Sequence, residues 1–375
     1  MLSHDDIIER ELMIHDWIKN NIDGLQQRAV VTIPVVVHVV WNKNEENIPD
    51  AQIYSQIEVL NKDFRAANTE IPGIPTVFKN LVADVEFEFC LATKAPNGSP
   101  TNGITRTFTN NSVGIGGTVN IHYTSMGGRN AWDPLKYLNI WVAKFAGGVG
   151  VAASFPGTGP IAEDGVQIDY RHFGNINTEP PYHLGRTCTH EIGHYFNLEH
   201  VWGPSITSCC NDDDFVADTP NACETYLGQC PTHPVVSCTQ PDMFMNYMFY
   251  TDDACMGMFT LGQKARMWAA LNAFRPGLLT SDACGTVNTH DSAAISRLVV
   301  FRNPFSEKLQ FEIQSSTPEN WLVLLTDMFG RKFMEIYVAS NGLQEMPVED
   351  LPSGLYLLSC ENGRERLIEK VLLVK

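Results

Sequence analysis

An eleven-residue segment that begins at His190 has the pattern H-E-x-x-H-x-x-N-x-x-H, with three imidazoles and one carboxylate close together. On a helix, residues four apart share a face, so His190 and His194 can present two nitrogens to one zinc ion. Glu191 then lies beside the ion, where it can accept a proton from a water molecule that zinc acidifies. His200 does not continue the helical face, so the chain must turn near Asn197, a residue that tolerates left-handed backbone. The segment therefore predicts a helix that ends within a catalytic zinc site; the alternative is a helix with incidental histidines.

The composition is that of an acidic globular protein. Its 375 residues suffice for two or three domains, and 44% of them are hydrophobic. The net charge of -17 comes from 43 acidic and 26 basic residues. This balance argues against nucleic acid and anionic membranes as partners and is compatible with calcium binding. The most apolar stretch, residues 30–40, is too short to span a bilayer and predicts a buried strand.

The cysteines indicate an oxidising compartment. Seven of the ten lie between Cys188 and Cys255, and such clustering in a loop-rich segment is typical of disulfide bonds. One alternative is a structural zinc site, which the absence of a C-x-x-C pair in this segment disfavours, and another is reduced cytosolic thiols. The first ten residues lack the apolar stretch of a secretory signal. We expect the sequence to start after a removed signal, the alternative being a protein that is not exported.

The hydrophobic pattern before the zinc motif mixes helical and extended segments. Residues 165–170 have the pattern of an edge strand, and residues 202–241 predict a long loop held by disulfide bonds. A helix over 261–274 is expected to pack below the metal site. The other expected elements are helices over 5–20 and 51–64, the second capped by Asp50, and strands over 30–40, 82–91 and 137–142.

The last ninety or so residues have a different pattern. Small polar residues over 285–292 indicate a linker, and short strand-like runs separated by turns follow. This pattern favours a small β-sandwich, and without clustered His or Cys it offers no catalytic candidate. The runs are 298–305, 309–313, 321–327, 332–337, 354–360 and 366–374.

A methionine-rich segment, Met243 to Tyr250, follows His200 by about fifty residues, where metzincin peptidases place a methionine turn under their metal. Met248 is the candidate for that turn, although methionine-rich stretches more often pack in ordinary cores. Tyr250 can reach the metal from the side and donate a hydrogen bond to the oxyanion of a tetrahedral intermediate. Its alternative role is that of a surface or core tyrosine.

Together these segments resemble the pappalysin family of metzincin metalloproteases, in particular its bacterial ulilysin-like members. The match spans roughly residues 30 to 275 and departs from the metzincin pattern at Asn197, where glycine is usual. Besides the zinc motif it rests on Ile33–Val40, Ala131–Pro134, Tyr137–Trp141, Gly185–Thr189, Asp218–Pro220 and Asn246–Cys255.

The resemblance implies a set of catalytic roles and a strand above the cleft that pairs with the substrate backbone, for which residues 165–170 are the candidate. The implied roles are His190, His194 and His200 as zinc ligands, Glu191 as general base and acid, Met248 as the methionine turn, and Tyr250 as support for the transition state.

The resemblance also implies structural calcium near the primed side of the cleft and particular disulfide bonds. A short loop rich in aspartate, which we call the acidic loop, contains Asp213, Asp214, Asp218 and Thr219 and offers their oxygens as calcium ligands. The alternative is that this loop is only solvated. The implied pairs are Cys230 with Cys255, and Cys238 with either Cys209 or Cys210.

Family members are made as latent zymogens, and residues 1–28 resemble the remnant of a pro-segment. Some relatives block zinc with a pro-segment cysteine, but no cysteine precedes Cys90 here. A carboxylate is the substitute, and Asp23 beside Gly24 is the candidate, with an ordinary helix-end residue as the alternative.

The C-terminal residues resemble the sorting domains of the bacterial type IX secretion system. This second resemblance implies export through outer-membrane secretion machinery and subsequent removal of the domain. It explains oxidised cysteines and a secreted or cell-surface location. The residues that carry it are Asn303–Phe305, Asp327–Arg331, Leu351–Tyr356 and Lys370–Lys375.

The sequence thus predicts an α+β protein, with a metzincin-type zinc protease domain of mixed sheet, active-site helix and methionine turn, followed by a small all-β sandwich. The expected parts are a pro-segment over 1–28, a catalytic domain over 29–284, a linker over 285–295 and a sorting domain over 296–375. The predicted function is a secreted zinc-dependent endopeptidase acting on proteins or peptides; the alternative is a non-catalytic secreted protein that binds zinc and calcium. Asp252 or Asp253 is expected to line the pocket for the residue after the scissile bond and to favour Arg or Lys there.

Overall fold

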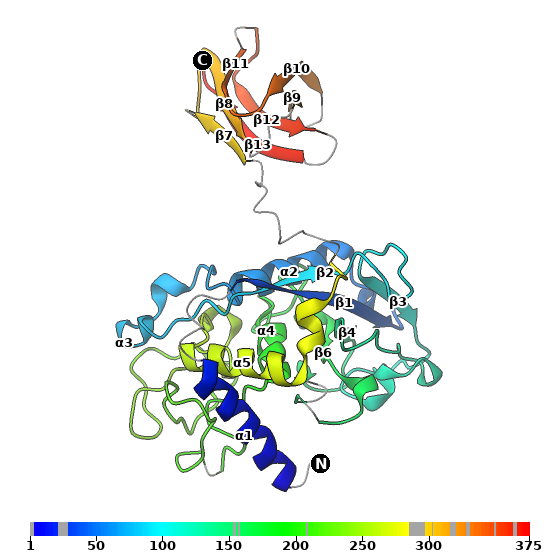
Figure 1. The fold of residues 1–375 in the computed structure, drawn as a ribbon, viewed down its shortest axis with the longest axis vertical. Coiled ribbons are helices and arrows are strands. Elements are labelled where there is room, and N and C mark those ends of the chain that lie inside the picture. Colours follow the sequence, from blue (N-terminus) through cyan, green and yellow to red (C-terminus); the bar gives the residue numbers. More distant parts are fainter. Residues whose placement is uncertain are drawn as a thin grey trace. The chain divides into compact units, whose positions relative to one another are not determined.

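The computed structural model contains two compact units, residues 1–286 and 287–375 (Figure 1). The predicted linker and Asp23 lie outside the described residues. The structure describes residues 4–21, 29–152, 155–156, 158–207, 209–284, 297–301, 303–315, 320–327, 331–348, 350–362 and 366–375.

Strand β1 (Val31–Trp41) is the centre of a six-stranded sheet in the first unit. Its β-branched residues favour extended backbone, and it pairs in parallel with β2 along its first half, with β3 along its second half, and with β4 on its other side. Strand β6 continues the parallel order beyond β4. The bounds of the strands that join β1 are Phe87–Leu91 for β2, Ile104–Phe108 for β3, Leu138–Ala143 for β4, Gly150–Ala152 for β5 and Val166–Asp169 for β6.

Both faces of β1 are buried, as expected of a parallel strand covered on two sides. Side chains alternate between the faces, so Ile33, Val35, Val37 and Val39 enter the main core together with the helices. Val36 and Val40 belong to two smaller clusters. The main core thus positions the helices on one face of the sheet.

The prediction of an edge strand over residues 165–170 is wrong in one respect. Residues 165–170 form β6, but β6 lies between β4 and the short antiparallel strand β5, which occupies the edge. The expectation failed because β5 is only three residues long and lies in a Gly-rich segment. The predicted strand over 82–91 is likewise shorter, since Glu86 has a left-handed φ of 64° and β2 begins at Phe87.

The helices agree closely with the sequence pattern. Helix α1 contacts α5, on which Ile14 packs against Ala269 and Ala270. The cap of α2 is Pro49 instead of the predicted Asp50, because the extended backbone ends at the proline and Asp50 is already helical. None of the described helices is long and apolar enough to cross a membrane. The helices are α1 (His4–Asn21), α2 (Asp50–Asp63), α3 (Thr76–Lys79), α4 (Arg186–Tyr195) and α5 (Leu261–Phe274).

The second unit consists of two antiparallel sheets, with strand orders β10-β9-β12-β13 and β11-β8-β7. Leu309 and Phe311 from one sheet and Trp321 and Val323 from the other are fully buried in one core, which makes the unit a β-sandwich. Strand β11 was missed, since its five residues include polar residues and a proline. The bounds are Arg297–Phe301 for β7, Lys308–Gln314 for β8, Asn320–Asp327 for β9, Lys332–Ala339 for β10, Leu343–Pro347 for β11, Gly354–Glu361 for β12 and Arg366–Leu373 for β13. The predicted α+β class with an all-β C-terminal unit is confirmed.

Candidate metal centre and substrate pocket

Three histidine nitrogens converge on one point at the end of α4. The Nε2 atoms of His190, His194 and His200 are 3.1 to 3.3 Å apart. Two nitrogens that lie about 2.05 Å from a tetrahedral ion are about 3.3 Å apart, so the triad has the dimensions of a zinc site. The three side chains thus fit three corners of a tetrahedron.

The other ring nitrogens fix the tautomers of two of these histidines. His190 Nδ1 donates to the Tyr247 carbonyl at 2.7 Å, and His194 Nδ1 donates to the Leu198 carbonyl at 2.6 Å. Because a carbonyl only accepts, each Nδ1 carries the proton and each Nε2 keeps its lone pair. Burial lowers the pKa of His190 to about 3 and that of His194 to about 4. Neutral rings with converging lone pairs fit a divalent cation.

A turn at Asn197 brings His200 to the triad. Helix α4 ends at Tyr195, and Asn197 has a φ of 70°, which confirms the predicted left-handed residue. The Leu198 N–H then donates to the Gly193 carbonyl at 3.0 Å, as in a helix that closes on a left-handed residue. The two polar side-chain atoms of Asn197 are buried and have no partner within the described part of the chain. Asn197 therefore contributes to the site through its left-handed backbone, which allows the chain to turn toward His200.

Met248 lies directly beneath the active-site helix. It is fully buried, and a Cβ added to Gly193 would lie only 2.5 Å from its sulfur atom. The turn is held by Asn246, which accepts the Met248 N–H at 2.9 Å and exchanges two side-chain hydrogen bonds with Gln263 of α5. The structure therefore brings Met248 to the helix that carries two of the histidines.

Glu191 and Tyr250 both lie close to the histidine triad. Glu191 is 7% exposed, and a Cβ added to Gly150 of β5 would be 3.1 Å from its Oε1 atom. The Tyr250 ring is 4.8 Å from the His200 ring and 5.5 Å from the His190 ring. Burial, and then the nearby Glu191, raises the pKa of Tyr250 to about 12, so the hydroxyl remains a donor at neutral pH. Strand β5, which was not predicted from the sequence, thus lies beside Glu191.

A cavity of about 230 Å³ extends from the triad. Asp253 lies in its lining, whereas Asp252 does not. Asp253 Oδ2 accepts the backbone N–H groups of Leu184 and Arg186 at 2.7 and 3.2 Å, and its Oδ1 has no hydrogen-bond partner among the described residues. Burial raises the pKa of Asp253 to about 6. The cavity is lined by Gly148, Val149, Gly150, Tyr182, Arg186, Thr187, His190, Glu191, Leu227, Phe249, Tyr250, Asp253 and Met256.

The structure brings only two of the four predicted calcium ligands, Asp214 and Thr219, into contact. Among the described residues, the carboxylates of the acidic loop form no group of three with oxygens within 4.8 Å of one another. Asp213 and Asp214 accept backbone N–H groups of their own loop, and Asp214 also accepts the Thr219 hydroxyl at 2.7 Å. Asp218 accepts a hydroxyl and an N–H at the start of α5, at 2.6 and 2.9 Å. Each carboxylate therefore already has an internal partner.

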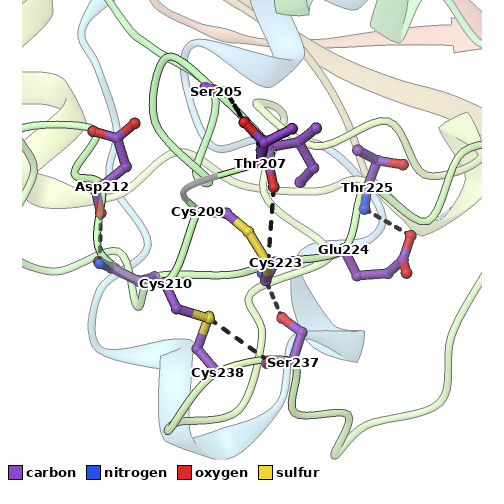
Figure 2. Close-up of a disulfide and its surroundings, with 12 residues drawn as sticks. Ser205, Thr207, Cys209, Cys210, Asp212, Cys223, Glu224, Thr225, Ser237 and Cys238 are labelled. Atoms are coloured by element: carbon purple, nitrogen blue, oxygen red, sulfur yellow. Dashed lines mark hydrogen bonds between the residues drawn. A yellow bond between two sulfur atoms is a disulfide. The ribbon is translucent and has the colours of Figure 1, made fainter.

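The structure contains four disulfide bonds, three of which lie in the loop region that follows the zinc motif. Figure 2 shows Cys209 bonded to Cys223, and Cys238 is bonded to Cys210, one of the two expected alternatives. The bond between Cys230 and Cys255 is the one that the resemblance implied. Cys90 with Cys284 was not predicted, because the two are 194 residues apart. The free cysteines among the described residues, Cys188 and Cys360, are both buried.

Helix α1 reaches the edge of the metal centre. The Arg10 guanidinium lies 5.4 Å above the Phe155 ring, which in turn is 5.4 Å from the His194 ring. Glu11 forms an ion pair with Arg266 at 2.7 Å, and Arg266 Nε donates to the Asn197 carbonyl at 2.7 Å. The N-terminal helix is therefore linked to the turn that carries His200.

This fold and this histidine triad are typical of a metalloendopeptidase, and comparison with known proteins gives its family. A family model described as pregnancy-associated plasma protein-A matches residues 123–272. Mature mirolysin of Tannerella forsythia in complex with a cleaved peptide is 44% identical, with a TM-score of 0.62, over 67% of this chain and 96% of that one. A promirolysin mutant from the same organism is 42% identical, also with a TM-score of 0.62, over 72% of this chain and 92% of that one. The chain belongs to the pappalysin family of metzincin metalloproteases.

The comparisons also bear on location. An extracellular metalloprotease of Arthroderma otae is 29% identical over 260 residues, which are 66% of this chain and 81% of the relative. Residues 299–375 match the model of a secretion system C-terminal sorting domain. The chain is therefore a secreted metalloendopeptidase with a sorting domain at its C-terminus, and the family implies zinc as its metal.

Proposed function

We propose that the chain is a zymogen-derived zinc endopeptidase in which Glu191 is the general base and His190, His194 and His200 hold the metal. The observation that carries the proposal is the convergence of three Nε2 atoms 3.1 to 3.3 Å apart, with Glu191 next to them in a cavity. When bound, zinc supplies a Lewis acid that polarises the scissile carbonyl and acidifies water.

The chain's own groups then handle the protons. Glu191 accepts a proton from the attacking water and later donates it to the leaving amine, a role that its burial and its place in the cavity support. Tyr250 donates its hydroxyl proton in a hydrogen bond to the developing oxyanion, which its raised pKa supports. Met248 supports the triad from below, because its sulfur packs against Gly193 of the active-site helix.

Strand β5 is the proposed binding site for the substrate backbone. It pairs only with β6 among the described strands, so one of its edges is not used by the sheet. Gly148 and Gly150, before and within β5, line the cavity. The missing side chain at Gly150 leaves room beside Glu191, since a Cβ there would be 3.1 Å from the carboxylate. An extended peptide can therefore add to this edge with its scissile bond above Glu191.

Asp253 is the proposed determinant of bond preference. Asp253 lines the cavity next to the triad, and its buried Oδ1 has no hydrogen-bond partner among the described residues. A Lys or Arg side chain after the scissile bond would supply the missing donors. Asp253→Asn should lower cleavage before Lys and Arg about tenfold or more relative to cleavage before Met. Cleavage-site profiling of a peptide library by mass spectrometry checks this. An unchanged profile would remove Asp253 from the proposal.

Glu191→Ala tests the mechanism. We expect the variant to bind one zinc per chain, as the wild type does, and to lose about 10²- to 10⁴-fold in cleavage of a casein-like substrate. Metal analysis and the cleavage assay separate this outcome from a non-catalytic zinc-binding protein, whose closed metal site would have four protein ligands. Full activity of Glu191→Ala would refute the role of Glu191.

Calcium binding by the acidic loop is a separate proposal. Its support is the sequence, which places Asp213, Asp214, Asp218 and Thr219 in one short loop. Each carboxylate has an internal partner in the structure, so calcium has to replace hydrogen bonds to bind there. We expect calorimetry with zinc-loaded enzyme to detect weak calcium binding that Asp214→Asn removes. No binding would assign these carboxylates to hydrogen bonding alone.

The ends of the chain are proposed to control when the enzyme acts. Residues 1–28 would form the pro-segment, with Asp23 as the group that blocks the metal, and residues 296–375 would be removed after export. The contact of α1 with the edge of the metal centre supports a regulatory role for the N-terminal segment. Mass spectrometry of the secreted enzyme checks both processing sites. Asp23→Ala should give premature activity, and a fully latent variant would exclude Asp23.

A further inference from the structure

Arg186 puts a positive charge into the lining of the proposed substrate pocket. It is the first residue of α4, is only 5% exposed, and lines the same cavity as Asp253. A guanidinium in this place opposes the binding of a basic substrate side chain unless its charge is compensated. The properties of the pocket therefore depend on the groups that bind Arg186.

Two carboxylates that are far from Arg186 in the sequence bind this guanidinium. Asp63, the last residue of α2, lies 2.8 Å from Arg186 Nη1, and Glu70 lies 2.9 Å from Nη2. Asp63 also accepts the Thr189 hydroxyl at 2.6 Å, and the Arg186 guanidinium lies 5.7 Å from the centre of the Tyr247 ring. Both guanidinium amino groups are thereby directed to Asp63 and Glu70.

The result is that Arg186 and Asp253 share a pocket without a side-chain ion pair between them. Only the backbone N–H of Arg186 bonds to Asp253, at 3.2 Å, and it uses Oδ2. The Oδ1 atom of Asp253 keeps no partner among the described residues. Without Asp63 and Glu70, the guanidinium of Arg186 would be free to pair with Asp253, to which its backbone already bonds.

We propose that Asp63 and Glu70 are positioning residues for substrate selection, which hold and neutralise Arg186 so that Asp253 stays available to a Lys or Arg side chain of the substrate. This inference rests on the proposed bond preference of Asp253. It assigns a role in specificity to two residues that come more than one hundred positions before the zinc motif.

Stability alone is a poor reason for this arrangement. Burying two or three charged groups costs solvation free energy that their mutual attraction often only offsets, and apolar side chains of similar size are frequently as stable. A charged cluster at the lining of a pocket does affect which ligand charge the pocket accepts. The test must therefore separate selectivity from general activity.

Glu70→Gln is the best test variant, because its side chain is 24% exposed and the substitution keeps the shape. Its matched control is Glu86→Gln, which breaks an ion pair with Lys264 of comparable length, 2.8 Å against 2.9 Å, at a site that does not line the pocket. Two peptides that differ only in Lys or Met after the scissile bond report selectivity as a ratio of kcat/KM values. Asp63→Asn serves as a second variant, with thermal melting as a check on its fold.

We expect Glu70→Gln to lower the Lys-to-Met ratio about tenfold, mainly through KM for the Lys peptide, while the Met peptide changes less than about twofold. Glu86→Gln should leave the ratio unchanged. An equal loss on both peptides, or an unchanged ratio in Glu70→Gln while Asp253→Asn loses the Lys preference, would overturn the inference. A ratio that survives Asp253→Asn as well would instead refute the bond preference itself.

Discussion

The zinc motif and the acidic loop both concentrate metal-binding residue types in a short stretch, yet the structure treats them differently. In the first, three Nε2 atoms lie within 3.3 Å of one another while the Nδ1 atoms of His190 and His194 are used by backbone carbonyls. In the second, the carboxylate oxygens of Asp214 and Asp218 accept hydrogen bonds from hydroxyl and N–H groups of the protein. Spacing in the sequence nominates ligands, but convergence of atoms without internal partners makes a preformed site.

The largest expected effect is that of removing one of the three proposed zinc ligands. His194→Ala should reduce zinc from one per chain to a small fraction and reduce peptide cleavage roughly a thousandfold or more, because the metal supplies several kcal/mol of transition-state stabilisation. Metal analysis and a cleavage assay measure both. His122→Ala, which removes a buried imidazole outside the triad, should keep its zinc. Normal zinc content in His194→Ala would show that the histidine triad is not a preformed zinc site, and the contrast with the acidic loop would not hold.

A smaller effect is expected beside the metal, at Tyr250. Tyr250→Phe removes the hydroxyl but keeps the ring that packs against His200 and Trp202. Loss of one oxyanion donor should lower kcat about 10²-fold, with KM and zinc content nearly unchanged. Steady-state kinetics distinguish this from a packing role. A raised KM with normal kcat would show that Tyr250 binds substrate instead.

The turn at Asn197 should affect stability more than chemistry. Asn197→Ala forces an alanine into left-handed backbone, which costs about 1–2 kcal/mol, whereas Asn197→Gly relieves that strain. The difference corresponds to a few degrees in Tm for a unit of this size. Thermal melting of the zinc-loaded variants measures it. Equal Tm values would mean that the backbone of the turn is not what Asn197 contributes.

The smallest effect is expected in the acidic loop. Asp218→Asn weakens the two hydrogen bonds at the start of α5 and should cost about 1 kcal/mol of unfolding free energy without changing zinc content. Denaturant unfolding of the wild type and the variant provides the measurement. A loss of zinc in Asp218→Asn would show that the two regions are coupled after all.

The sequence predicted the local parts of the site and not the distant ones. His190, His194 and Asn197 follow from helical spacing and from the backbone that a turn requires, and both are properties of neighbouring residues. The ion pair between Asp63 and Arg186 joins residues 123 positions apart, and no periodic pattern in the sequence indicates such a contact. The edge strand was misplaced for a similar reason, because whether a strand lies at an edge depends on a partner elsewhere in the chain. The C-terminal sandwich was predictable, since the alternation of residue types along its strands indicates which side chains are buried.

The most direct test of the central claim is anomalous diffraction at the zinc absorption edge from crystals of the enzyme. We predict one strong peak about 2.0–2.1 Å from the Nε2 atoms of His190, His194 and His200. The acidic loop and the cysteine group Cys209, Cys210 and Cys223 should give none, because their oxygens and sulfurs already have partners. A peak at either of those places, or no peak at the histidine triad, would contradict the assignment of a preformed catalytic zinc site.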